Sequence, residues 1–197
     1  MPYTTPGTAT AGDVYTASAH NVIVGDIIDH ETRILTTGQV LTKSQAFSAV
    51  ASVSVTSCFN STYTNYTVII DCTFNTTNTA TLQLAASGVA STTGYYVLGT
   101  VTEAASGPTR QSDANVSSIS FFSGSTGTNG STFTVYRPNQ AASFTTITGT
   151  SFGGTGASVY LRNFGAQHNV TAAYDGLIFA FPGTTTGNIR VYGMLNS

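Results

Sequence analysis

The sequence predicts an all-β fold, an antiparallel β-sandwich of the jelly-roll type, preceded by an extended N-terminal arm and one short α-helix. From about residue 46 onwards, apolar and polar residues alternate with a period of two, as in strands with one buried face. Gly, Asn, Ser and Pro interrupt this alternation at short intervals, which is typical of a sandwich or barrel. We therefore divide the chain into residues 1–45, the arm and helix, and residues 46–197, the β-sandwich domain.

The first segment, MPYTTPGTATAG, holds two prolines and two glycines and shows no alternation. Such a composition offers no apolar face to bury, so we expect an extended arm whose order depends on the surface that it lies against.

A helical pattern follows Asp13, with Thr16 or Ser18 as the candidate N-cap and Gly38 shortly past its end. Isoleucine at both kinds of core position of a heptad seam favours three strands, so we expect a homotrimer. The alternative is that this stripe packs against the chain's own β-sandwich. The seam residues are His20, Ile23, Ile27, His30 and Ile34.

The candidate strands of the β domain are short runs bounded by turn residues. There are about nine of them, enough for two packed sheets. We assign the glycine-rich segment GTSFGGTG (149–156) to a loop. The candidate strands are 50–57, 66–74, 80–86, 95–102, 117–123, 132–137, 157–164, 176–182 and 189–195.

The two cysteines, Cys58 and Cys72, are expected to be free thiols. If residues 50–58 and 66–74 form a hairpin, Cys72 lies opposite Ser52, and Cys58 lies roughly 20 Å further along the ladder. A disulfide needs Cα atoms within about 7 Å, so this hairpin forbids the bridge. Buried free cysteines suit a protein made in a reducing cytoplasm.

The low charge of the chain excludes several classes of partner. Only 7% of the residues are charged, the net charge is -2, and Lys43 is the one lysine. No basic stripe could neutralise several phosphates, so we expect neither nucleic acid nor an anionic membrane as a partner. The N-terminus lacks the apolar core of a signal peptide, and no apolar run is long enough to span a bilayer.

The sequence indicates no metal, cofactor or catalytic site, and we expect no enzyme. The cysteines and three histidines lack metal-ligand spacing, although His20 or His30 on a three-fold axis could surround an ion. No nucleophile elbow or phosphate-binding loop occurs. Four carboxylates could meet in space as a glycosidase pair, yet no local pattern identifies one. They are Asp71, Glu103, Asp113 and Asp175.

Tyrosines on a neutral, hydroxyl-rich surface are candidates for binding sugars, because a phenol ring stacks and also forms hydrogen bonds. We select Tyr63, Tyr95 and Tyr96 as candidate receptor or glycan contacts. The alternative is that each tyrosine is half buried in the sheet and bridges neighbouring strands.

Three segments together resemble a group of tailed-bacteriophage virion proteins: YTTPGTATAGDVYTASAHN (3–21), CFNSTYTNY (58–66) and YDGLIFAFPGTTTGNIRVYGM (174–194). That group opens with a Pro/Thr-rich arm leading into a short helix, carries a turn similar to FxSTYxNY and ends in a hairpin close to RVYGY. Here Met194 stands where the group often has Tyr, and residues 80–165 match only in strand rhythm. The resemblance implies a structural protein of the virion, made in the bacterial host cytoplasm, and supplies no catalytic residues.

Two functions follow from these expectations. In the first, residues 1–45 attach a tail-fibre-like homotrimer to the particle, and the β-sandwich contacts host surface glycans. In the second, the protein decorates or cements the particle, its arm lies across neighbouring capsid, portal or tail proteins, and it has no receptor role. A free carbohydrate-binding or hydrolytic module is a third, weaker alternative.

Overall fold

The computed structural model describes residues 38–77, 79–123, 126–155 and 158–195. Within these ranges the regular secondary structure consists of strands, and there is no helix. The predicted all-β class is therefore confirmed. The predicted arm and helix, with the seam residues His20, Ile23, Ile27, His30 and Ile34, lie outside the described residues. The strands are β1 (Gln39–Val55), β2 (Asn65–Phe74), β3 (Thr79–Ala86), β4 (Val89–Ala90), β5 (Tyr95–Glu103), β6 (Gly107–Val116), β7 (Ile119–Ser123), β8 (Gly127–Tyr136), β9 (Thr145–Thr155), β10 (Ser158–His168) and β11 (Gly176–Met194).

Strand β1 begins before the predicted start of the β domain. It pairs with the end of β11 from Gln39, opposite Met194, through Gln45, opposite Ile189. Residues 39–45 therefore belong to the sheet and not to the arm. Apolar and polar residues alternate only weakly in this segment. The reason is that β1 is an edge strand, which pairs with β11 alone in the described sheet.

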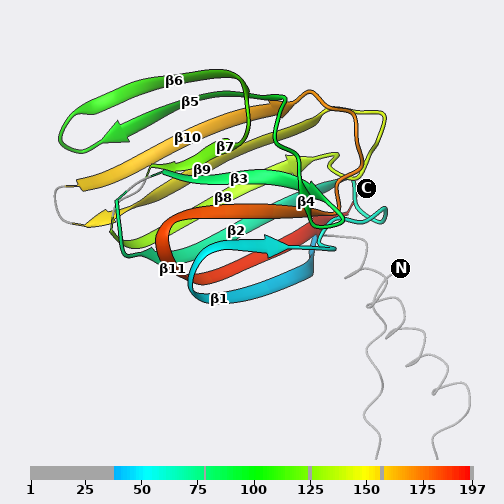
Figure 1. The fold of residues 1–197 in the computed structure, drawn as a ribbon, viewed down its shortest axis with the longest axis horizontal. Coiled ribbons are helices and arrows are strands. Elements are labelled where there is room, and N and C mark those ends of the chain that lie inside the picture. Colours follow the sequence, from blue (N-terminus) through cyan, green and yellow to red (C-terminus); the bar gives the residue numbers. More distant parts are fainter. Residues whose placement is uncertain (1–37, 78, 124–125, 156–157, 196–197) are drawn as a thin grey trace, which may run out of the picture. The chain divides into compact units, whose positions relative to one another are not determined.

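All the strands belong to one antiparallel sheet, which curls over itself (Figure 1). Its main path runs β4-β3-β11-β2-β8-β9-β10-β5-β6, with β1 beside β11 and β7 beside β3. Four of the eight neighbouring pairs in this path are not consecutive in the sequence, so the strand order could not be deduced from alternation.

The longest strand, β11, connects two parts of the sheet. Its first limb, Gly176–Ala180, pairs with β3, whereas its second limb, Thr185–Met194, pairs with β2. Between them the strand bends (Figure 1). The stretch between the limbs contains Pro182, which has no N–H, and Gly183, whose φ is 76°. The closing hairpin that the resemblance implies is therefore not formed by these two limbs, because they pair with β1, β2 and β3 and not with each other.

The predicted hairpin between residues 50–58 and 66–74 is also wrong. Val55 of β1 lies opposite Leu177, and Ile70 of β2 lies opposite Ile189, so β11 separates the two strands. Alternation indicates which face of a strand is buried but not which strand lies beside it. The expectation of free thiols is nevertheless confirmed, because Cys58 and Cys72 are both unpaired and buried.

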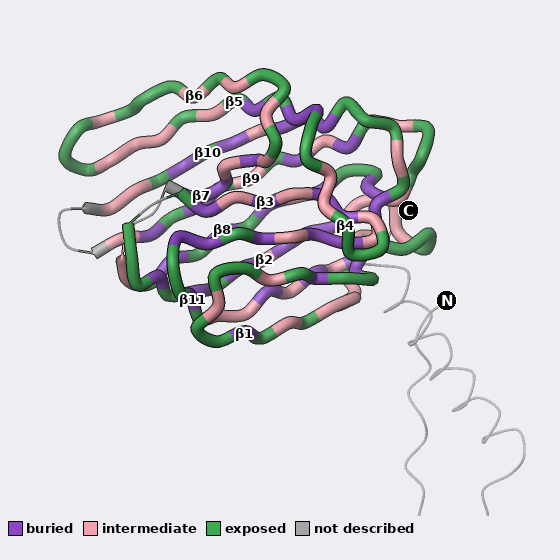
Figure 2. The backbone as a smooth tube through the Cα atoms, viewed as in Figure 1, coloured by how far each residue is buried: buried purple, intermediate pink, exposed green. Residues whose placement is uncertain are grey.

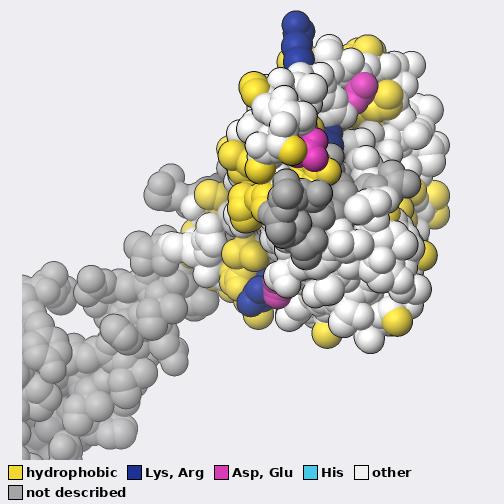
Figure 3. Space-filling model, turned by 90° about the vertical axis from the view of Figure 1, so that its left-hand side faces the viewer, with side chains coloured by type: hydrophobic (Ala, Val, Ile, Leu, Met, Phe, Trp, Pro, Cys, Tyr) yellow, Lys and Arg dark blue, Asp and Glu magenta, His cyan; other side chains and the backbone are white. Residues whose placement is uncertain are grey.

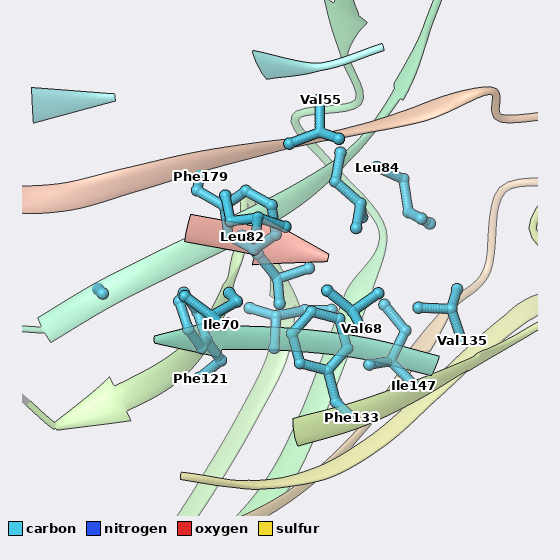
Figure 4. Close-up of a cluster of buried hydrophobic side chains, with 14 of the residues drawn as sticks. Val55, Val68, Ile70, Leu82, Leu84, Phe121, Phe133, Val135, Ile147 and Phe179 are labelled. Atoms are coloured by element: carbon cyan, nitrogen blue, oxygen red, sulfur yellow. The ribbon is translucent and has the colours of Figure 1, made fainter. Parts of the chain in front are cut away.

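The core lies inside the curl of the sheet. Phe121 of β7 packs against Phe133 of β8 and Phe179 of β11, with ring centroids 6.2 and 5.7 Å apart, respectively. These contacts join distant strands of the sheet, and each such buried side chain contributes about 1.5–3 kcal/mol. Figure 4 shows this cluster, and Figure 2 shows buried stretches along the strands that enclose it.

Two longer strands, β6 and β9, were not predicted from the sequence. Strand β9 contains Gly149 and Gly153, which were assigned to a loop. A Cβ atom on Gly149 would lie 2.3 Å from Cβ of Phe133, and one on Gly153 would lie 2.0 Å from Oδ1 of Asn129. These glycines therefore allow β8 and β9 to approach closely, and they do not mark a turn.

Candidate functional site

The face of β9, β10, β5 and β6 that points away from the core is called the outer face here. Alternation along these strands places Ile147 and Phe164 in the core, and Thr148 and Asn163 on the outer face. Most of the side chains on this face are hydroxyls and amides. Figure 3 shows one side of the molecule, on which charged side chains are few.

A glycine makes a depression in the outer face. Gly165 of β10 lies opposite Thr148 of β9 on one side and opposite Leu98 of β5 on the other. A Cβ atom on Gly165 would have no other atom within 4 Å. The missing side chain therefore leaves a space between two walls formed by neighbouring strands.

This space is part of an open groove, called the Gly165 groove here, with a volume of about 740 Å³. Strand register brings its walls together from four separate parts of the chain. The lining residues are Leu98, Gly99, Thr100, Arg110, Gln111, Thr148, Gly149, Thr150, Asn163, Phe164 and Gly165. No Asp or Glu is among them.

The polar side chains of the groove are suited to binding hydroxyl groups. Thr150 Oγ1 donates a hydrogen bond to Asn163 Oδ1 over 2.9 Å, which orients the Asn163 amide. Threonine hydroxyls donate and accept, and an amide has both a donor and an acceptor end. Neighbouring hydroxyls of a sugar present the same mixture, so the groove can satisfy them without a charge.

The groove also has an apolar side. Leu98 is 60% exposed, and Tyr96, two residues earlier on the same face of β5, is 41% exposed. Exposed apolar side chains next to polar groups often mark binding surfaces. Leu98 and Tyr96 could pack against the C–H face of a sugar while the threonines and Asn163 bind its hydroxyls.

The three tyrosines selected from the sequence have different environments. Tyr96 is exposed and lies beside the Gly165 groove, whereas Tyr63 is half buried and packs against Gly193. The prediction for Tyr95 is wrong, since its ring is fully buried. Its hydroxyl accepts from Leu84 N over 2.8 Å and donates to Ser91 O over 3.1 Å, so it fastens the sheet and cannot reach a ligand.

A buried histidine makes a contact that resembles a catalytic pair. His168 Nε2 lies 2.9 Å from Ser91 Oγ and 3.0 Å from the carbonyl oxygen of Thr93. A carbonyl can only accept, so Nε2 carries the proton and cannot take one from Ser91. Nδ1 then accepts from the Tyr174 hydroxyl over 3.2 Å. Burial lowers the pKa of His168, and the neutral ring has a structural role.

The cysteine thiols have no reactive environment. Burial raises the pKa of Cys58 to about 12 and that of Cys72 to about 12, so neither is a thiolate near neutral pH. Within the described ranges, no group of three His, Cys, Asp or Glu side chains could hold a metal ion. The described part of the chain also has no helix that could cross a membrane.

Comparisons with known proteins identify no relative. No family model matches the chain, and no curated protein is similar to it in sequence. The candidate function therefore depends on the groove and on the sequence itself.

Most residues of the Gly165 groove were missed in the sequence. Arg110 and Thr150 lie in segments that were not predicted to be strands, and Asn163 lay in a predicted strand without a suggested role. One local signal was present: Thr146, Thr148 and Thr150 alternate with Thr145, Ile147 and Gly149, which is the period of a strand with one hydroxyl face.

Proposed function

We propose that the β domain binds glycans at the Gly165 groove and is the receptor-binding part of a tail-fibre-like virion protein. The single observation that carries this proposal is the groove: a hydroxyl- and amide-lined depression without a carboxylate, with Leu98 and Tyr96 exposed beside it. Such a combination of a few polar groups and an apolar wall is typical of small-ligand sites. The sequence resemblance to phage virion proteins supplies the biological setting.

For the fold, we propose a two-layered sandwich of the jelly-roll type. The bend of β11 and the ring contacts between β7 and β8 support two layers, because they bring β3 and β7 over the rest of the sheet. In this arrangement the outer face belongs to the wider layer and stays open to a ligand.

The test of glycan binding uses a pair of glycines on the exposed side of the sheet. Gly165→Leu fills the groove, whereas Gly130→Leu adds the same side chain on β8, where a Cβ atom would meet only Ile70 O at 3.8 Å. Glycan-array binding by the purified protein should be lost in Gly165→Leu and kept in Gly130→Leu. Thermal unfolding of both variants controls for folding. Equal binding by both variants, or no binding by the natural protein, would contradict the proposal.

For attachment, we propose that the segment before β1, residues 1–38, joins three copies of the chain to a neighbouring capsid, portal or tail protein. Ile27 and Ile34 of the heptad seam support this proposal. Replacing both with Asn should dissociate the trimer and leave the β domain folded, since each apolar contact contributes roughly 1.5–3 kcal/mol. Light scattering that gives the same mass before and after substitution would argue against the seam.

Location in the particle tests the receptor role. Immunogold labelling of intact phage with antibody against the β domain should place gold at the tail end. Gold over the capsid shell would instead favour a decoration protein.

A further inference from the structure

Among the residues that the structure describes, Arg110 is the only charged one that lines the Gly165 groove. It lies on β6 opposite Thr100, whose side chain is on the outer face, and it is exposed. Arg110 therefore forms part of one wall of a groove whose other polar side chains are neutral.

The carboxylates of the described residues bind other groups. Asp71 forms an ion pair with Arg190 over 2.9 Å, and Glu103 accepts from Ser106 Oγ over 2.7 Å. Asp175 accepts from the backbone nitrogen of Ser87 over 2.9 Å. None of these contacts involves Arg110.

Asp113, on the same strand as Arg110, belongs to the other face of the sheet. It lies opposite Val97, which is buried, and it accepts a hydrogen bond from Gln111 Nε2. Gln111 Oε1 in turn accepts from the guanidinium of Arg162, which is 4% exposed. Asp113 is thus part of a network under the sheet, next to a different arginine.

Arg190 provides an internal comparison. It also lies on the exposed side of the sheet, but Asp71 binds its guanidinium through both carboxylate oxygens, at 2.9 and 3.1 Å. Among the described residues, Arg110 has no such carboxylate partner. An exposed cation beside a groove that lacks carboxylates favours anions over cations.

We propose that the Gly165 groove selects acidic saccharides and that Arg110 binds their negatively charged substituent. This inference rests on the proposed glycan-binding function and adds the class of glycan. The planar guanidinium can donate two parallel hydrogen bonds to a carboxylate, as in a uronic or ulosonic acid, and can also bind a sulfate ester. Thr100, Thr148 and Asn163 bind the hydroxyls of the same sugar.

The first experiment is a glycan array that holds uronic, ulosonic and sulfated glycans together with neutral glycans of matched backbone. Acidic glycans should dominate the bound set, and the carboxylated and sulfated arms show which substituent is preferred. Binding to neutral glycans alone would overturn the inference but leave the proposed function standing. Absence of binding to every glycan would contradict the proposed function itself.

The second experiment tests the role of Arg110, with the acidic glycan that binds most tightly on the array as the ligand. Arg110→Gln should raise Kd about 10- to 100-fold, the effect of losing a charged hydrogen-bonding group. Arg137→Gln is the matched control, because Arg137 is exposed but does not line the groove. Arg110→Lys keeps the charge without the planar fork, so partial recovery indicates charge alone and no recovery indicates two parallel hydrogen bonds.

Two further measurements separate ligand binding from a structural role. Thermal unfolding should be unchanged in Arg110→Gln, since exposed substitutions have small effects on stability. Binding of the acidic glycan should weaken as salt increases, because exposed charges are screened. An unchanged Kd in Arg110→Gln would overturn the inference.

Discussion

The phenolic oxygen of Tyr66 lies 2.7 Å from both the backbone nitrogen and the backbone oxygen of Asn60, so the hydroxyl accepts one hydrogen bond and donates another. Asn60 Oδ1 also accepts from Thr62 N over 2.9 Å, which closes an Asx turn. Phe59 and Tyr63 contact the Tyr66 ring, with centroids 4.7 and 6.0 Å away, respectively. The segment CFNSTYTNY therefore forms a turn that is stabilised by the hydrogen bonds of Tyr66.

Replacing Tyr66 with Phe should destabilise the domain by about 1–3 kcal/mol, because two backbone groups of Asn60 lose their partner in a partly buried site. Urea unfolding measures the loss. Tyr136→Phe is the control: Tyr136 is 36% exposed at the end of β8, so removal of its hydroxyl should have little effect. Equal stability of the two variants would show that the tyrosine does not hold the turn.

Gly149→Ala should destabilise the domain by roughly 1–3 kcal/mol, because the new Cβ overlaps Phe133 and the backbone of β8. Gly165→Ala, on the adjacent strand, should change stability by no more than about 0.5 kcal/mol, since its Cβ meets nothing within 4 Å. Thermal and urea unfolding of the two proteins provide the comparison. A large loss of stability in Gly165→Ala would mean that other atoms of the protein fill the space beside Gly165.

Acidification should destabilise the domain through His168. Burial lowers its pKa below the ordinary value of about 6.5, which the unfolded chain keeps. As pH falls below about 6.5, the unfolded state binds a proton that the folded state does not, so the free energy of unfolding decreases until the native pKa is reached. Urea unfolding across this range should show a weaker pH dependence in His168→Gln. The same slope in both proteins would exclude His168 as the cause.

The thiols of Cys58 and Cys72 should resist iodoacetamide in the folded protein near pH 8, because burial holds both pKa values at about 12. In denaturant both should react and add two carbamidomethyl groups, as measured by mass spectrometry. Rapid alkylation of the native protein would show that the structure around one of these cysteines opens readily.

Much of the local structure could be predicted from periodicity. Tyr66, Val68 and Ile70 fall at every second position, and all three are buried on one face of β2. Strand β6 could not be predicted, because its sequence, GPTRQSDANV, has few apolar residues that could alternate with polar ones. It lies at the edge of the sheet. A strand that buries little leaves a weak pattern in the sequence.

The candidate site was largely beyond sequence reasoning. Leu98, Arg110, Thr148 and Asn163 come from four strands whose order and register are set by long-range pairing. Composition indicated a neutral, hydroxyl-rich surface, and Tyr96 was correctly placed on it, but the depression exists because Gly165 has no side chain between two particular neighbours. A single sequence cannot show which residues will be those neighbours.

The position of β11 in the sheet also affects how the domain folds. This strand is synthesised after the other ten, yet β1, β2 and β3 all bond to it, starting with Gln39 opposite Met194. Pairings between such distant residues make folding slow, because a long loop must close before any contact forms. During synthesis, the edges of β2 and β3 that pair with β11 stay open until β11 leaves the ribosome. The growing chain is therefore most exposed to aggregation just before β11 emerges.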